Sequence, residues 1–287
     1  MLLVVMQHTG GMLDPGIRLL CKVDVPLFFL VSGYLAYKPY IDIKKQFVKL
    51  IKRVFIPFVL ACLFAALYFQ DNVLDIFISS GKRGYWFLEA LFLMKLLFWI
   101  IYKNKRILIT GGLIIEACLL ILSKYGSDTL DGILCISYMS RYFPCLLAGA
   151  IIKMTNYHAL SNKWYGAMLS IIAFVGLGIY FKSTNISFIA HVLGYAAAAV
   201  LAFMVIKRYT DSLPKWIHKS FSYIGIYSLN IYIIHWYFVS YVNFNLGGIF
   251  IYDFTVTLAI ALIVVALSIV TGKILTYCTP LGLILTK

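Results

Sequence analysis

The sequence of 287 residues is 62% hydrophobic and 13% charged, with a mean hydropathy of +0.92. Too few polar residues are present to cover a soluble globule of this size, so the composition excludes a soluble domain and indicates that lipid surrounds the protein. The net charge of +14 comes from 25 Lys and Arg against 11 Asp and Glu. In a membrane protein such an excess reflects topology, and we expect membrane lipid and no nucleic acid as a partner.

Long apolar segments predict an all-α fold, a polytopic bundle of helices. Only helices and closed barrels satisfy their backbone groups in hydrocarbon, and apolar runs such as 258–270 lack the alternation of barrel strands. A short apolar segment at the start and nine longer ones predict about ten membrane-spanning helices in a single integral domain, residues 1–287. The longer segments lie near residues 24–40, 54–70, 85–102, 107–123, 133–152, 164–181, 186–206, 221–241 and 248–270.

Basic residues in the connections predict the orientation. Alternate connections contain 17 and 7 Lys and Arg, and the richer set is expected to face the cytoplasm. We therefore expect a protein of the inner membrane with both termini in the cytoplasm. Residues 1–13 would rise only about 20 Å as a helix, against a hydrocarbon core of about 30 Å. Either the first helix stops short or the chain lacks residues upstream of Met1, and its length favours the second interpretation.

Neither a metal site nor a removable leader is expected. The six cysteines form no Cys-x-x-Cys pair and have no histidine at ligand spacing. The start of the sequence has no basic leader and no small-residue cleavage site, so we expect no removable signal peptide.

His8 is the first ionisable residue inside an apolar helix, where such groups are costly. It lies beside Thr9, and an imidazole can accept a proton from a hydroxyl near neutral pH, as acyl transfer to a sugar requires. The residues alone favour the alternative, a histidine hydrogen-bonded between helices.

A polar stripe lies in the segment SLNIYIIH. Ser228, Tyr232 and His235 are spaced i, i+4 and i+7 and share one helix face. In a membrane such a stripe points into the bundle, toward either a substrate or partner helices, and both interpretations stay open. Within the stripe, His235 is the stronger candidate for contact with a substrate.

Two other segments combine apolar and polar residues. In PLFFLVSGY, Ser32 and Gly33 are small enough to let another helix approach closely, and Ser32 lacks the Gly-x-Ser-x-Gly setting of a nucleophile. In GYWFLEALF, Trp86 and Glu89 share a helix face, and we expect Glu89 to form an ion pair with Arg141. The sequence offers no explanation for Glu116 in the fifth span.

A basic cluster before Pro57 has two interpretations. The positive-inside rule and contacts with anionic lipid account for most of it. Alternatively, it holds the phosphates of coenzyme A, with Arg53 the most important residue. The cluster consists of Lys44, Lys45, Lys49, Lys52 and Arg53.

Several segments, in this order, resemble the acyltransferase-3 family of bacterial membrane proteins. His8 is similar to its first-helix histidine, VPLFFLVSGYL (25–35) to its Phe-Phe-x-x-Ser-Gly signature, and KLIKRVFIPF (49–58) to its basic third-helix entry. YWFL (85–88), YFPCLLAG (142–149) and IGIYSLNIYIIH (224–235) resemble later blocks.

Two positions depart from the family pattern. An arginine usually found upstream of the histidine would precede Met1 here. Leu50 stands where the first of two paired arginines would fall, so that only Arg53 matches.

The resemblance implies transfer of an acyl group, usually acetyl from acetyl-coenzyme A, to a hydroxyl of a cell-envelope glycan or lipid-linked sugar at the bacterial inner membrane. It makes His8 the catalytic base and assigns the donor to Arg53, with Lys52 and Lys49 beside it. The expected substrate-binding residues are Ser32, Trp86, Glu89, Arg141, Ser228, Tyr232 and His235. A glycan or lipid transporter or flippase is the main alternative, because interior polar residues also suit a passage, and a silent assembly partner is a third.

Overall fold

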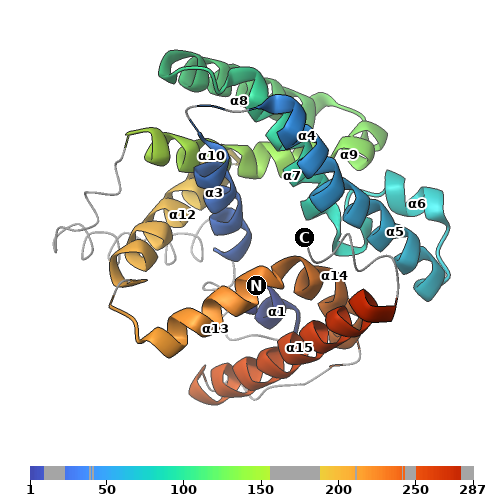
Figure 1. The fold of residues 1–287 in the computed structure, drawn as a ribbon. Helices are drawn as coiled ribbons and strands as arrows, with labels where there is room; N and C mark the ends of the chain where they lie inside the picture. Colours follow the sequence, from blue (N-terminus) through green and yellow to red (C-terminus); the bar gives the residue numbers. More distant parts are fainter. Residues whose placement is uncertain are drawn as a thin grey trace. The chain divides into compact units, whose positions relative to one another are not determined.

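The computed structural model describes residues 1–9, 23–38, 40, 42–155, 188–210, 212–240, 242 and 250–278. Every regular element in these ranges is helical, which confirms the predicted all-α fold. The chain forms two compact units, residues 1–25 with 212–287 and residues 26–211. Figure 1 shows the helices, coloured along the sequence from blue at the N-terminus to red at the C-terminus. The expectation of one integral domain stays a prediction.

The first unit is built on its longest helix, α15 (Phe250–Cys278). Both α1 (Leu2–Thr9) and α14 (Ser228–Val239) pack against α15, and Figure 1 shows the three helices together. Their contact is a continuous apolar core beside His8 of α1 and His235 of α14. The core consists of Val5, Met6, Ile231, Val239, Ala261, Val264, Val265 and Ile269.

The predicted span 221–241 is interrupted. The helix α13 (Lys215–Ile226) ends one residue before α14, because Tyr227 leaves helical geometry with φ −92° and ψ 10°. The break follows Gly225, a residue of low helix propensity. Each of the two helices has 12 residues and rises only about 18 Å, too little to cross a bilayer alone. The prediction of one continuous helix here is therefore wrong.

The second unit places α10 (Ile136–Thr155) among three other helices. These are α7 (Trp86–Ile101), α8 (Lys105–Tyr125) and α12 (Phe188–Thr210), and all three pack against it. The other elements of this unit are α3 (Asp24–Ala36), α4 (Ile43–Leu50), η1 (Ile51–Phe55), α5 (Ile56–Phe69), α6 (Val73–Ile78), η2 (Lys82–Gly84) and α9 (Asp128–Leu134).

Four described helical stretches are long and apolar enough to cross a membrane: Ile43–Phe69, Lys105–Tyr125, Val192–Thr210 and Ile251–Leu275. The pair α9 and α10, bent by 48°, would make a fifth. The expected count of about ten is therefore not confirmed in the described part of the chain, and the predicted span 164–181 lies outside it.

Glycines bring α3 and α10 together. A Cβ on Gly33 of α3 would lie 1.9 Å from the carbonyl oxygen of Leu146, and a Cβ on Gly149 of α10 would lie 1.9 Å from that of Leu30. Any side chain at either position would therefore push the two backbones apart. This confirms the prediction that the small residues after Phe28–Phe29 allow a close helix approach, and it identifies α10 as the partner.

A tight connection joins α6 to α7. Lys82, Arg83 and Gly84 have positive φ values of 41°, 50° and 92°, the left-handed conformation found in tight turns. The Arg83 guanidinium donates to Asp71 through Nε at 2.6 Å and a second nitrogen at 2.7 Å. This bidentate pair stabilises the carboxylate and holds the pKa of Asp71 below its usual range.

Candidate functional site

Two histidine rings lie side by side in the first unit. The last turn of α1 carries His8, and its ring centroid lies 5.6 Å from that of His235 in α14. The edge of Trp236 packs against His8 at 4.9 Å between centroids. The His8 side chain is exposed, whereas only 3% of His235 is accessible. The arrangement places an exposed imidazole beside a buried second ring.

One hydrogen bond fixes the buried ring. His235 Nδ1 lies 2.9 Å from the carbonyl oxygen of Ile231, and since a carbonyl only accepts, Nδ1 carries the proton. In the neutral ring Nε2 is then the atom with a lone pair. Among the described residues this buried Nε2 has no hydrogen-bond partner, so it is the nitrogen left available for another molecule.

The predicted polar stripe of α14 is only partly brought together. Tyr232 is buried and its ring lies 5.9 Å from that of His235, while Ser228 is half-buried at the first residue of the helix. The sequence prediction missed Asn230, which is 1% exposed and lies on a different face. Its Nδ2 would be 2.8 Å from a Cβ on Gly272, so this asparagine packs tightly on α15. In the sequence, the only signal for Asn230 is that it is a polar residue within a mostly apolar helix.

A column of aromatic rings lies in the second unit. Trp86 stacks on Tyr138 at 3.8 Å and on Tyr142 at 5.7 Å, and Tyr142 stacks on Phe29 at 5.3 Å. The Arg141 guanidinium lies 5.9 Å from the centre of the Tyr138 ring. Of the predicted substrate-binding residues, Trp86 thus belongs to this column and Arg141 lies beside its Tyr138 ring.

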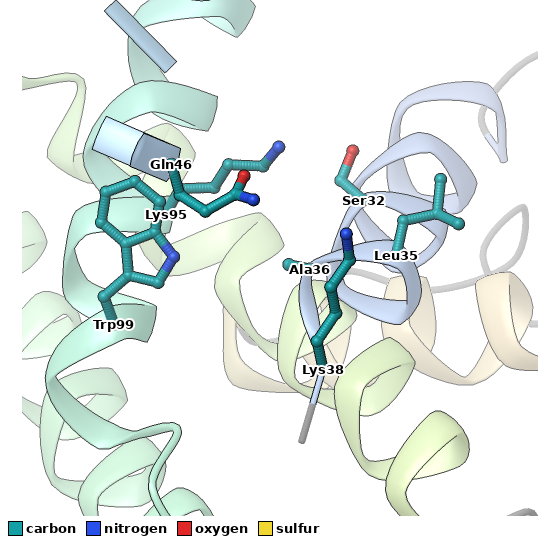
Figure 2. A pocket seen from close by; sticks show the side chains of 7 residues that line it. All are labelled: Ser32, Leu35, Ala36, Lys38, Gln46, Lys95 and Trp99. Atoms are coloured by element: carbon teal, nitrogen blue, oxygen red, sulfur yellow. The ribbon is translucent and has the colours of Figure 1, made fainter. Parts of the chain in front are cut away.

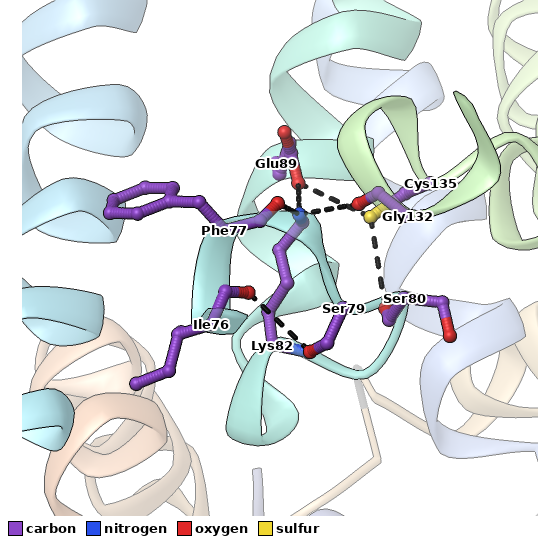
Figure 3. A network of polar contacts seen from close by, with 8 residues as sticks. All are labelled: Ile76, Phe77, Ser79, Ser80, Lys82, Glu89, Gly132 and Cys135. Atoms are coloured by element: carbon purple, nitrogen blue, oxygen red, sulfur yellow. Dashed lines mark hydrogen bonds and ion pairs between the residues drawn. The ribbon is translucent and has the colours of Figure 1, made fainter. Parts of the chain in front are cut away.

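The ion pair predicted between Glu89 and Arg141 is wrong, because Glu89 pairs with Lys82. Lys82 is 0% exposed, and its Nζ lies 3.2 Å from Glu89 Oε2. The same ammonium donates to the carbonyl oxygens of Phe77 at 2.5 Å and Gly132 at 2.6 Å, as Figure 3 shows. Cys135 Sγ also donates to Glu89 Oε2, at 3.2 Å. The positive φ at Lys82 turns this side chain back under the loop, which residue spacing does not reveal.

A pocket of about 160 Å³ lies between α3, α4 and α7. Ser32, Leu35, Ala36 and Lys38 line one side, and Gln46, Lys95 and Trp99 line the other. Figure 2 shows the Lys95 and Lys38 side chains extending into the space between them. Of the predicted site residues, Ser32 belongs to this pocket. Lys95, a cation inside the predicted span 85–102, was not among the predicted site residues.

The three predicted donor-binding residues lie along one helical run. Lys49 lies in the last turn of α4, and Lys52 and Arg53 belong to η1, a π-helical turn between α4 and α5. All three side chains are exposed. Single π turns inside α-helices occur frequently at functional sites. Gln46 of the pocket lies one turn before Lys49 in α4.

Two further observations concern acidic groups and metals. Both carboxylate oxygens of Glu116 in α8 are buried with no hydrogen-bond partner among the described residues, and its role stays unexplained. Within the described ranges, no group of three or more His, Cys, Asp or Glu could hold a metal ion.

The apolar helices, the histidine pair and the lysine-lined pocket define a helical membrane protein with interior polar sites. The acyltransferase-3 family model, described as an acyltransferase domain, matches residues 1–273, and the chain belongs to this family. The family match confirms the resemblance and supports a membrane acyltransferase activity. No match was found among curated proteins or among solved structures.

Proposed function

We propose that this protein transfers an acetyl or other acyl group from acyl-coenzyme A to a hydroxyl of a cell-envelope glycan or lipid-linked sugar. It would do so in the bacterial inner membrane, with both termini in the cytoplasm. The family supports acyl transfer in general, and the donor, the acceptor and the orientation are our proposal.

The observation that carries the proposal is the histidine pair. The His8 side chain is exposed, while the His235 and Trp236 rings pack against its ring. A positioned imidazole is the commonest general base in proteins. The position of His8 in α1, beside a ring that is itself hydrogen-bonded at Ile231, therefore favours a catalytic over a purely structural histidine.

The proposed step is a direct transfer. His8 accepts the proton of the sugar hydroxyl as its oxygen attacks the thioester carbonyl carbon, forming a carbon–oxygen bond. The carbon–sulfur bond breaks, and the proton passes to the leaving thiolate of coenzyme A. A base in this role typically contributes about 10²- to 10⁴-fold in rate.

The other residues would bind the two substrates. Arg53, Lys52 and Lys49 are exposed cations on one helical run and suit the phosphates of the donor. Trp86 offers an aromatic face and Arg141 a hydrogen-bonding fork to a sugar. The proposed substrate-binding set is Ser32, Trp86, Glu89, Arg141, Ser228, Tyr232 and His235.

The test is a transfer assay with purified protein in lipid nanodiscs. [¹⁴C]acetyl-coenzyme A is supplied with an extract of envelope glycans and lipids, and the label in that extract is counted. We expect label to accumulate with wild type and to fall about 10²- to 10⁴-fold in His8→Ala. His218→Ala, a histidine of α13 outside the proposed site, is the matched control and should retain transfer.

Two outcomes would contradict the proposal. Equal transfer by wild type and His8→Ala would remove His8 as the base. Movement of an unmodified labelled glycan across the bilayer, with no acyl transfer by the wild type, would favour a transporter instead.

A further inference from the structure

The pocket between α3, α4 and α7 contains two lysines from different helices. Lys95 is half-buried in α7 and Lys38 follows α3, and both ammonium groups extend into the pocket (Figure 2). No carboxylate lines the pocket among the described residues, and neither lysine forms a salt bridge with a described residue. The pocket therefore holds an excess of positive charge that nothing described neutralises.

The position of Lys95 in α7 is energetically unfavourable for a charged side chain. Its helix, WFLEALFLMKLLFWII, has only one other ionisable side chain, and an ammonium inside an apolar helix costs free energy unless it reaches a polar partner. The contrast with Lys82 is direct. The Lys82 ammonium has two carbonyl oxygens and a carboxylate, whereas Lys95 ends in a pocket.

The remaining lining fits an anion with an apolar neighbour. The hydroxyl of Ser32, the amide of Gln46 and the indole N–H of Trp99 can each donate a hydrogen bond. Leu35 and Ala36 add an apolar wall. A carboxylate has only two acceptor oxygens, whereas a phosphate ester has more and matches two ammonium groups and several neutral donors.

We propose that this pocket binds a phosphate ester through Lys95 and Lys38, and that Lys95 is the main anchor because it is the more buried of the two. The proposed phosphate binding does not depend on the proposed role of His8 as a base. Assigning the phosphate to coenzyme A rests on the proposed function, and the other source of the same chemistry is the headgroup of an anionic phospholipid.

The test measures equilibrium binding of [³H]coenzyme A to wild type and variants in nanodiscs of zwitterionic lipid. Lys95→Met should weaken binding about tenfold to a hundredfold, the range for one hydrogen-bonded charge. Lys95→Arg should retain most of it, and Lys38→Met should have a smaller effect. Lys103→Met removes an exposed cation just beyond α7 and should change nothing. Lys95→Arg keeps the positive charge, so retained binding in this variant together with weak binding in Lys95→Met attributes the loss to the charge.

A second arm identifies the source of the phosphate. Nanodiscs containing phosphatidylglycerol are compared with zwitterionic ones, and thermal stabilisation by the anionic lipid is measured for wild type and Lys95→Met. Loss of stabilisation only in Lys95→Met, with coenzyme A binding unaffected, supports a lipid phosphate. If Lys95→Met changes neither ligand's effect, the pocket does not bind phosphate and the proposal is overturned. Transfer lost in His8→Ala would still support the proposed function in that case.

Discussion

Among single residues, the interior polar groups of this protein differ in how well hydrogen bonds satisfy them. Lys82 is fully buried and its ammonium has three oxygen partners. The Nε2 of His235 is buried without a described partner, and Lys95 ends in a pocket. An unsatisfied polar group costs more in hydrocarbon than in water, so the satisfied Lys82 indicates a structural role. That His235 and Lys95 instead contact a ligand is our proposal.

Lys82 should therefore matter for stability. Lys82→Met leaves the Glu89 carboxylate and two carbonyl oxygens without their shared donor, and breaking a buried pair typically costs about 3–5 kcal/mol. We expect a lower free energy of unfolding and a lower melting temperature in detergent, measured by intrinsic fluorescence. The exposed Lys124→Met is the control and should melt like wild type.

The double variant separates the pair from the loop. Lys82→Met combined with Glu89→Gln removes both charges, so it should be destabilised by less than the sum of the two single changes. A Lys82→Met protein that melts at the wild-type temperature would show that this network does not hold α6, α7 and α9 together.

Residue spacing predicted some site residues and not others, for physical reasons. His8, Ser32 and Trp86 lie in local patterns that a linear sequence displays. Lys82 reaches Glu89 only because of a positive φ, and Lys95 meets Lys38 only because three helices converge. The catalytic and binding roles proposed for these residues stay predictions.

At the level of helices, close packing without side chains decides which ones pair. The crossing of α3 and α10 depends on Gly33 and Gly149, each of which meets backbone of the other helix. In lipid, no hydrophobic effect draws helices together, so close van der Waals contact contributes much of their association. This crossing also fixes α3, which carries Ser32 into the pocket.

Gly149→Val should separate the two helices. Its Cβ would lie 1.9 Å from the Leu30 carbonyl oxygen and 2.8 Å from the Tyr34 nitrogen, both backbone atoms that cannot move alone. Overpacking of this kind costs about 1–3 kcal/mol or more, so we expect less monodisperse protein by size-exclusion chromatography and a lower melting temperature. Gly225→Ala in α13 meets nothing within 4 Å and should be neutral or slightly stabilising.

Helix boundaries were harder to predict than helix existence. The sequence prediction began the third span near residue 54, whereas the helical run begins at Ile43, where Asp42 Oδ1 caps it by accepting from the Lys45 N–H. The run passes through η1 into α5 without a break. Hydropathy locates the apolar part of a helix, and it does not register a polar, capped turn that continues the same helix outside the lipid.

For the molecule as a whole, composition predicted the solvent and the fold class better than the number of crossings. The all-α fold is confirmed, and the family match covers residues 1–273. Counting apolar segments overlooked that α3 has 13 residues and that α13 and α14 are separated at Tyr227. A mean over a window cannot detect such a break, because a single residue such as Tyr227 changes the mean hydropathy of the window little.

The orientation of the chain is the remaining prediction, and α8 allows a direct test of it. This helix has 21 residues, about 32 Å at 1.5 Å per residue, so it is long enough to cross the hydrocarbon core. Lys103, Lys105 and Arg106 lie at its start, whereas Lys124 is the only basic residue of its last turn. By the positive-inside rule the start faces the cytoplasm.

Reporter fusions show on which side of the membrane each end of α8 lies. Alkaline phosphatase is active only outside the cytoplasm and a fluorescent protein folds inside it, so each is fused after Lys103 and after Gly126. We expect fluorescence after Lys103 and phosphatase activity after Gly126. Fusions after Lys45 and Asn245, the latter outside the described residues, should read cytoplasmic and external in the same way. The reverse pattern at both ends of α8 would place the basic cluster of α4 and η1 outside the cytoplasm, where acyl-coenzyme A is absent, and would remove its proposed role in binding the donor.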